Sequence, residues 1–166
     1  MRRRFGKLIN ELAKKDNKIV LIVGDIGYGI FDDFRESHPK KFFNLGICEQ
    51  SLIGVASGLA LQGLKPWVYT ITPFLIERPF EQLKLDIDQQ NVNVNLVGFA
   101  DYPNLGPSHS EMDAKKLMSL FKNIRSFFPK NSKDTQKIIY KCHKIKSPTF
   151  MSLKSDILPI AIHMVT

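Results

Sequence analysis

The chain contains the run Ile19-Val20-Leu21-Ile22-Val23, five apolar residues that are followed at once by the turn residues Gly24 and Asp25. A continuous run of β-branched residues and leucine of this length predicts a strand that is buried on both faces. Such strands occur in parallel sheets that helices cover on both sides. The run therefore predicts an α/β fold.

Apolar runs of strand length alternate with stretches of helical period along the rest of the chain. The predicted strands cover residues 19–23, 42–45, 67–71, 92–99, 124–127 and 149–153. The predicted helices cover residues 4–15, 49–61, 79–87, 113–121 and 132–143. This alternation predicts a doubly wound, mostly parallel sheet with helices on both faces. We expect one domain over residues 1–156 and an apolar tail at residues 157–166.

The helix predicted at 49–61 has an apolar stripe of helical period, which we expect to face the sheet. The stripe consists of Leu52, Val55, Ala56, Leu59 and Ala60. The same helix carries Gly54 and Gly58, and Gly63 ends it. Small residues let another backbone approach closely. The helix therefore either packs tightly on its own sheet or lies at a subunit interface, as in a homodimer or a heterotetramer.

The composition excludes several classes of protein. Of the 166 residues 43% are apolar, as in a globular protein. The two cysteines, Cys48 and Cys142, and the four histidines are scattered, so we expect no metal site in this chain. The start at Met1 lacks the apolar core of a signal peptide, and no apolar run approaches membrane-spanning length. We predict a cytoplasmic protein without membrane contact.

The formal charge of +8 raises the question of nucleic-acid binding. The basic residues are spread along helical stretches such as Lys14-Lys15, Lys115-Lys116 and 137–146. A binding arm would concentrate them and interleave aromatic residues. We therefore interpret them as solvated helix faces and expect no nucleic-acid partner.

The carboxyl ends of parallel strands are where an α/β sheet binds its ligands. The loop 24–29 follows the first predicted strand and is rich in glycine, but its spacing fits neither a dinucleotide fingerprint nor a Walker loop. We interpret it as a tight turn. The loop before Glu49 follows the second predicted strand. A glutamate in a first helical turn often only complements the helix dipole, and position alone does not assign it a function.

Several linked motifs resemble the pyrimidine-binding domain of transketolases and deoxyxylulose-phosphate synthases, which use thiamine diphosphate. In chain order they are Asn44-Leu45-Gly46-Ile47-Cys48-Glu49-Gln50, Gly54-Val55-Ala56-Ser57-Gly58-Leu59-Ala60, Gly63-Leu64-Lys65-Pro66, Tyr69-Thr70-Ile71-Thr72-Pro73-Phe74-Leu75, Arg78-Pro79-Phe80-Glu81-Gln82 and Leu105-Gly106-Pro107-Ser108-His109. The resemblance covers most of residues 18–155 and implies the thiamine diphosphate-binding fold of the pyrimidine type.

The resemblance implies a catalytic role for Glu49. In that family the matching glutamate hydrogen-bonds the pyrimidine nitrogen of the cofactor. A proton shared there favours the imino form of the exocyclic amine, which then removes the proton of the thiazolium carbon. Cys48 has no histidine nearby in the sequence, so we expect it to be a small buried residue and not a nucleophile.

Other matched residues are candidates for the same site. Phe74 lies where the family places an aromatic ring against the aminopyrimidine. Phe80 fits either the cofactor pocket or the buried stripe of its helix, and Arg78 fits the pocket, an interface or the surface. His109 matches a histidine that faces the substrate near the reacting carbon. The chain departs from the family at Leu105, where many members have an acidic residue that contacts a sugar hydroxyl, and this argues against ordinary ketose-phosphate specificity.

The resemblance implies half of an active site. The family also needs a diphosphate-binding domain with a Gly-Asp-Gly motif, which holds Mg²⁺, and it usually has a third domain. We expect this chain to be the smaller subunit of a split transketolase, a transferase of carbohydrate metabolism acting on sugar phosphates or related ketoses. Alternatives are a deoxyxylulose-phosphate synthase-like chain, a 2-oxoacid dehydrogenase β-type chain, or a non-catalytic remnant.

Overall fold

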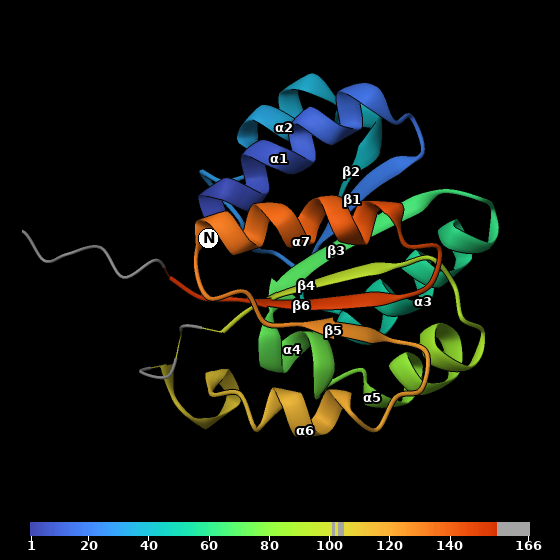
Figure 1. Cartoon of the computed structure of the whole chain (residues 1–166), viewed down its shortest axis with the longest axis vertical. Helices are drawn as coiled ribbons and strands as arrows, with labels where there is room; N and C mark the ends of the chain where they lie inside the picture. The colour runs from blue at the N-terminus through green and yellow to red at the C-terminus, as the bar shows by residue number, and fades with distance from the viewer. Residues whose placement is uncertain (101, 103–104, 156–166) are drawn as a thin grey trace, which may run out of the picture.

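The computed structural model describes residues 1–100, 102 and 105–155 (Figure 1). The predicted tail at residues 157–166 lies outside the described residues. The six strands form one sheet in which every neighbouring pair is parallel, in the order β2-β1-β3-β4-β6-β5. The strands are β1 (Ile19–Val23), β2 (Phe42–Asn44), β3 (Lys65–Ile71), β4 (Asn95–Phe99), β5 (Arg125–Phe127) and β6 (Thr149–Leu153). The predicted fold class is confirmed.

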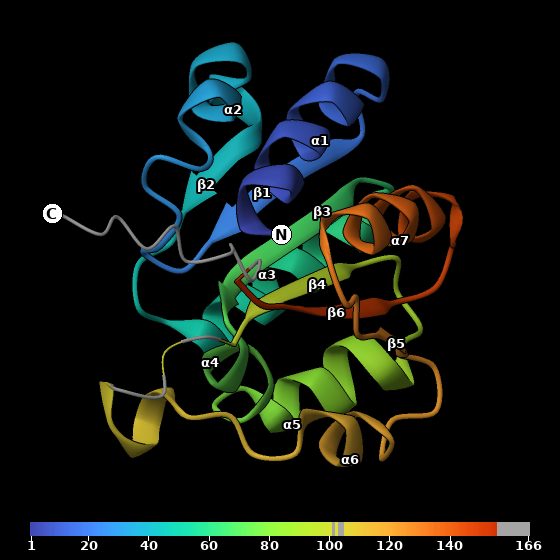
Figure 2. The same ribbon diagram turned by 60° about the vertical axis from the view of Figure 1, so that its left-hand side comes forward.

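Helices cover both faces of this sheet (Figures 1 and 2). One face is covered by α1 (Arg2–Lys15), α2 (Asp32–Ser37) and α7 (Ser132–Lys144). The other is covered by α3 (Glu49–Leu61), α4 (Thr72–Ile76), α5 (Phe80–Gln82), the π-helical segment η2 (Leu83–Gln89) and α6 (Ala114–Met118). Two 3₁₀ turns, η1 (Pro39–Lys41) and η4 (Pro107–His109), lie in connections. None of the helices in the described part of the chain has the length and apolar character needed to cross a membrane.

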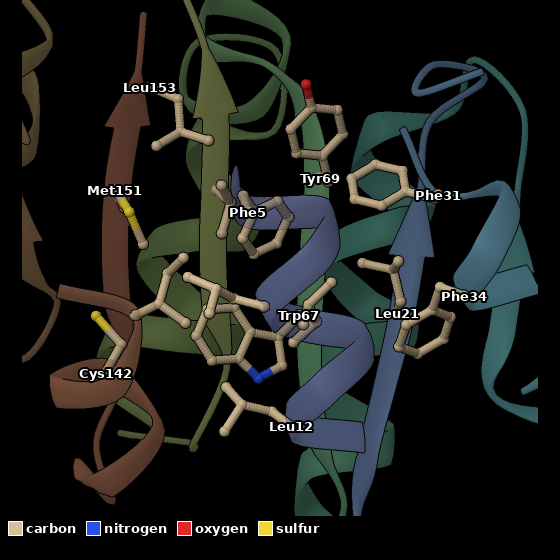
Figure 3. Packing of buried hydrophobic residues seen from close by; sticks show 14 of the residues in the cluster. Phe5, Leu12, Leu21, Phe31, Phe34, Trp67, Tyr69, Cys142, Met151 and Leu153 are labelled. Atoms are coloured by element: carbon tan, nitrogen blue, oxygen red, sulfur yellow. The ribbon is translucent and has the colours of Figure 1, made fainter. Parts of the chain in front are cut away.

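Large aromatic rings fill the core beneath α1. Phe5 of α1 stacks on Tyr69 of β3, with ring centroids 5.8 Å apart, and also contacts Trp67 (Figure 3). Alternate residues of each strand point to the two faces, so Trp67 and Tyr69 lie in this core while Val68 lies in the core beneath α3. Both faces of the central strands are thus buried, as the run at 19–23 predicts.

The predicted bounds agree with the structure to within two residues, except at the start of β4 and the end of α6. β1, α3 and β6 begin and end where the apolar patterns place them. β4 begins only at Asn95, three residues later than predicted. The helix predicted at 113–121 begins at Ala114, where the side chain of Asp113 accepts the backbone N–H of Lys116 at 3.1 Å and caps α6, and it ends early, at Met118. The apolar pattern predicted neither α2 nor α4.

The predicted stripe of α3 is wrong at one position. Val55 is 42% exposed, and Ile53 and Ser57 are buried in its place. Gly54 and Gly58 are also exposed, and a Cβ atom at either position would meet no other atom within 4 Å. These two glycines therefore do not serve close packing of α3 on its own sheet.

The order of the strands places a crevice at the carboxyl edge of the sheet. β2 lies on one side of β1 and β3 on the other, and ligands of open α/β sheets bind where the winding changes direction in this way. The connections that follow β1, β2 and β3 all begin at this edge. One of them, α4, lies directly against β4, because a Cβ atom at Gly98 would overlap Oγ1 of Thr72.

Candidate functional site

Glu49 is the first residue of α3, and its side chain is only 7% exposed. The turn before it is built by Gly46, whose φ of 78° lies in the left-handed region. Cys48 occupies the cap position of the helix, and its thiol donates to the carbonyl of Leu45 at 2.8 Å. Cys48 is partly exposed, so the prediction that it is buried is wrong. The turn thus presents a nearly buried carboxylate at the carboxyl edge.

Arg78 joins Glu49 to Phe74. Nη1 of Arg78 donates to Oε1 of Glu49 at 2.9 Å, and the guanidinium carbon lies 3.4 Å from the ring centroid of Phe74. The three side chains come from α3, from α4 and from the turn between α4 and α5. The structure therefore brings together three residues that the sequence analysis singled out separately.

His109 extends this group. Its ring centroid lies 4.8 Å from that of Phe74, at an interplanar angle of 63°. Gly106 opens the η4 turn with a φ of 94°, and the hydroxyl of Ser108 lies 3.1 Å from Nδ1 of His109. Residues that lie far from Glu49 in the sequence thus meet it at one edge of the sheet, where four of the five predicted site residues form a contiguous set.

Phe80 lies elsewhere. Its ring packs against Phe121 with centroids 5.2 Å apart, and it belongs to the core beneath η2. It also lines a groove with Lys84 and Asp88, separate from the hollow that Glu49 and Arg78 line. These contacts favour the interpretation of Phe80 as part of the buried stripe, and its role in cofactor binding stays a prediction.

A second polar group at this edge escaped the sequence analysis. Oδ1 of Asn44, at the end of β2, accepts the backbone N–H groups of Asp25 and Gly46, each at 3.0 Å. Oδ1 of Asp25 accepts the hydroxyl of Tyr28 at 3.0 Å, and this hydrogen bond raises the pKa of Tyr28. Asn44 thereby ties the loop after β1 to the turn before Glu49. The position of Asn44, two residues before the turn glycine Gly46, is the sequence feature that could have predicted this role.

The site offers one carboxylate, one aromatic face and one imidazole. A flat heterocycle with a basic ring nitrogen fits this set, because it stacks on an aromatic ring and shares a proton with a carboxylate. Among residues 1–100, 102 and 105–155, no three His, Cys, Asp or Glu side chains gather in a way that could hold a metal ion. Glu49 is moreover engaged with a cation.

Residues 1–159 match the family described as "Transketolase, pyrimidine binding domain". The chain therefore belongs to the pyrimidine-binding domain family of transketolases. The predicted resemblance is thereby confirmed.

Among curated proteins, the chain is similar to one subunit of the apulose-4-phosphate transketolase of Actinobacillus succinogenes. The two are 36% identical over 129 residues, which are 76% of this chain and 42% of that protein. It is also 31% identical over 149 residues to the 1-deoxy-D-xylulose-5-phosphate synthase of Nitratidesulfovibrio vulgaris (strain DP4), covering 87% of this chain and 23% of that protein. The chain spans about half, or less, of the length of the curated relatives it matches.

A solved structure described as "Split gene transketolase, inactive beta4 tetramer" has the same fold. It superposes with a TM-score of 0.86 at 31% identity, over 95% of this chain and 52% of that one. The similarity thus extends from the motifs around Glu49 to the whole of the described domain.

Proposed function

We propose that this chain is the pyrimidine-binding subunit of a thiamine diphosphate-dependent, transketolase-like enzyme. It would transfer a two-carbon ketol unit between sugar or sugar-phosphate substrates, together with a diphosphate-binding partner subunit. The observation that carries the proposal is the nearly buried carboxylate of Glu49 in one contiguous group with the ring of Phe74, at the carboxyl edge of a sheet of this family. The family membership and the likeness to a split-gene transketolase support it.

In this proposal Glu49 holds and moves a proton at the ring nitrogen of the pyrimidine. Its low exposure keeps bulk water from competing for that proton. Phe74 orients the flat ring by stacking. When bound, thiamine diphosphate supplies the thiazolium carbon that adds to the carbonyl group of the substrate.

His109 is proposed to face the substrate. Its contact with Phe74 puts the imidazole beside the proposed cofactor position, and the hydroxyl of Ser108 restrains its ring. Leu105, on the same loop, is 59% exposed and offers no side-chain acceptor to a sugar hydroxyl. The proposed substrates therefore include ketoses other than the common ketose phosphates.

We place the Mg²⁺ and diphosphate sites on the partner subunit. The described residues gather no ligand set for a metal ion, and a relative of this chain is by its name one of the subunits of a transketolase. The exposed face of α3 supports assembly, because Gly54 and Gly58 leave open space beside the apolar side chains of Val55 and Leu61. A homodimer or a heterotetramer would cover this face.

The assembly is tested by Gly58→Leu. A Cβ atom at this exposed position meets no atom within 4 Å, so we expect the circular dichroism spectrum of the fold to be unchanged. At an interface the same side chain would collide with the neighbouring subunit and shift sedimentation velocity toward the monomer. Lys137→Leu, on the exposed face of α7, is the matched control. Unchanged association of Gly58→Leu would remove α3 from the interface.

The function itself is tested by reconstitution. The purified chain is assayed for two-carbon transfer with thiamine diphosphate and Mg²⁺, alone and with a protein that carries the Gly-Asp-Gly domain. We expect turnover only in the mixture, since the chain supplies only the pyrimidine side of the site. Turnover by the chain alone would contradict the split site, and an inactive but stably assembled mixture would favour the non-catalytic alternative.

A second candidate function is a deoxyxylulose-phosphate synthase-like reaction. The observation that favours it is the 31% identity to such a synthase over 87% of this chain. In the reconstituted mixture it predicts decarboxylation of a 2-oxoacid donor. Two-carbon transfer from a ketose without release of CO₂ would exclude it.

A further inference from the structure

The guanidinium group of Arg78 makes two contacts in the site at once. Its central carbon lies 3.4 Å from the centroid of Phe74, and Nη1 donates to Oε1 of Glu49 at 2.9 Å. The proposed function gives the same two side chains to an aminopyrimidine ring, which would stack on Phe74 and share a proton with Glu49. A flat, nitrogen-bearing cation of this chain thus already makes the pair of contacts that the cofactor needs.

Both groups cannot occupy this position together. A separation of 3.4 Å is van der Waals contact, so nothing fits between the guanidinium and the ring. The side chain of Glu49 is 7% exposed, and the hollow that leads to it is lined by Arg78 itself, with Ile47, Cys48, Gln50 and Ser51. We propose that Arg78 is an internal competitor, which closes the pyrimidine subsite until the cofactor displaces it.

The surroundings of Arg78 allow this displacement. It lies in the turn between α4 and α5, and its side chain is 38% exposed, so it can swing into solvent without unpacking a helix. Because the Arg78 end of the pair is partly exposed, water can solvate its guanidinium when it leaves Glu49. While it lasts, the pair spares Glu49 from being a buried charge without a partner. Arg78 therefore stabilises the carboxylate of Glu49 in the free chain and opposes cofactor binding.

The test compares the wild-type chain with Arg78→Ala, using as probe the free aminopyrimidine alcohol that corresponds to the pyrimidine half of thiamine. If Arg78 closes the subsite for about 90% of the time, its removal tightens the apparent dissociation constant about tenfold. Arg78→Lys keeps the charge beside Glu49 but loses the flat face, and should shift binding in the same direction by less. Arg125→Ala removes one exposed charge from the edge strand β5 as the control. Equal binding by Arg78→Ala would overturn the proposal, and weaker binding would overturn it and make Arg78 a ligand of the cofactor.

The proposal rests on the proposed function, so a measurement without the probe separates the two. NMR of the Nε–H group of Arg78 in the free chain reports its stacking, because the ring of Phe74 shifts the signal. Phe74→Leu and Glu49→Gln should each move this signal. If neither substitution moves the signal, Arg78 is not an internal competitor, and the proposed function is unaffected. If both substitutions move the signal but no variant binds the probe, Arg78→Ala included, then both the proposed function and the role of Arg78 as a competitor are overturned.

Discussion

Two carboxylates at opposite edges of the sheet are each paired with a cation, in different ways. Asp16 caps α1 at the amino edge, where its Oδ2 lies 2.6 Å from Nζ of Lys65 at the start of β3. It also accepts the backbone N–H of Lys18 at 2.9 Å, and Nε2 of His143 lies 3.7 Å away. Glu49 is paired with the single side chain of Arg78, which is shared with an aromatic ring.

The difference separates a structural carboxylate from an exchangeable one. Asp16 is held by donors from the α1–β1 turn and from β3, so losing one contact does not free it. Burial opposes its ionisation, but the hydrogen bonds from Lys65 and Lys18 and the charges of Lys65 and His143 together lower the pKa of its carboxyl group. Glu49 has a partly exposed partner that can leave. A site that binds a ligand through its carboxylate needs a partner that can leave, as Arg78 can leave Glu49.

The largest effect that this comparison predicts concerns turnover. In the reconstituted enzyme, Glu49→Gln keeps the size of the side chain but cannot exchange a proton with the pyrimidine nitrogen. Turnover should fall by about 10²–10⁴, the usual contribution of a positioned acid–base group. Hydrogen–deuterium exchange at the thiazolium carbon, followed by NMR, should slow with it. Asp16→Asn is the control and should leave exchange unchanged, whereas equal exchange rates in wild type and Glu49→Gln would show that the catalytic carboxylate lies elsewhere.

The two cysteines also differ, in how far their thiols are exposed to solvent. Cys48 is partly exposed beside Glu49, while Cys142 of α7 is buried, and burial raises the pKa of its thiol to about 11. At pH 8 only about one Cys142 in a thousand is then a thiolate, the form that reacts. We expect iodoacetamide to modify Cys48 roughly a hundredfold faster in the native chain, as measured by peptide mass spectrometry. Equal rates in the folded chain, with Cys48→Ser and Cys142→Ser as controls, would contradict the difference between the two environments.

The smallest effect concerns stability. Asp16→Asn should lower the free energy of unfolding by about 2 kcal/mol at pH 7, because Asn keeps only one accepting oxygen and no charge to strengthen the hydrogen bonds from Lys18 and Lys65. Since the folded pKa of Asp16 is depressed, its stabilisation is present above the ordinary pKa of about 3.9 and is lost as the pH falls through the folded value. Urea unfolding should therefore show the gap between wild type and Asp16→Asn closing below about pH 4. A gap that persists at about pH 2 would mean that the pairing with Lys65 is not its source.

The fold was predictable from the sequence where the pattern was long and continuous. β1 is buried on both faces, so its unbroken apolar run marks it completely, and β6 is equally buried although it contains Thr149 and Ser152. In α3 the small and apolar residues extend round the helix, so periodicity could not decide between Val55 and Ile53 for the buried face. The helices α2 and α4 have six and five residues, too few for a helical period to show.

The candidate site was predictable residue by residue but not as an arrangement. Motif order singled out Glu49, Phe74 and His109 one at a time. The contact of Arg78 with Phe74 reaches past the end of α4 at Ile76 into the turn before α5, so no helical pattern in the sequence marked it. Asn44 was missed because its role, to join two loops that follow neighbouring strands, exists only once β1 and β2 pair.

The close approach of α4 to β4 gives one further position a strong influence on the site. Gly98 is the fourth residue of β4 and is not one of the candidate site residues, yet any larger residue there would push against Thr72, the first residue of the helix that carries Phe74. Saturation mutagenesis of the chain should therefore find Gly98 nearly as intolerant as Glu49. A mutational map alone would not distinguish the residue that meets the ligand from the one that leaves room for the helix that does.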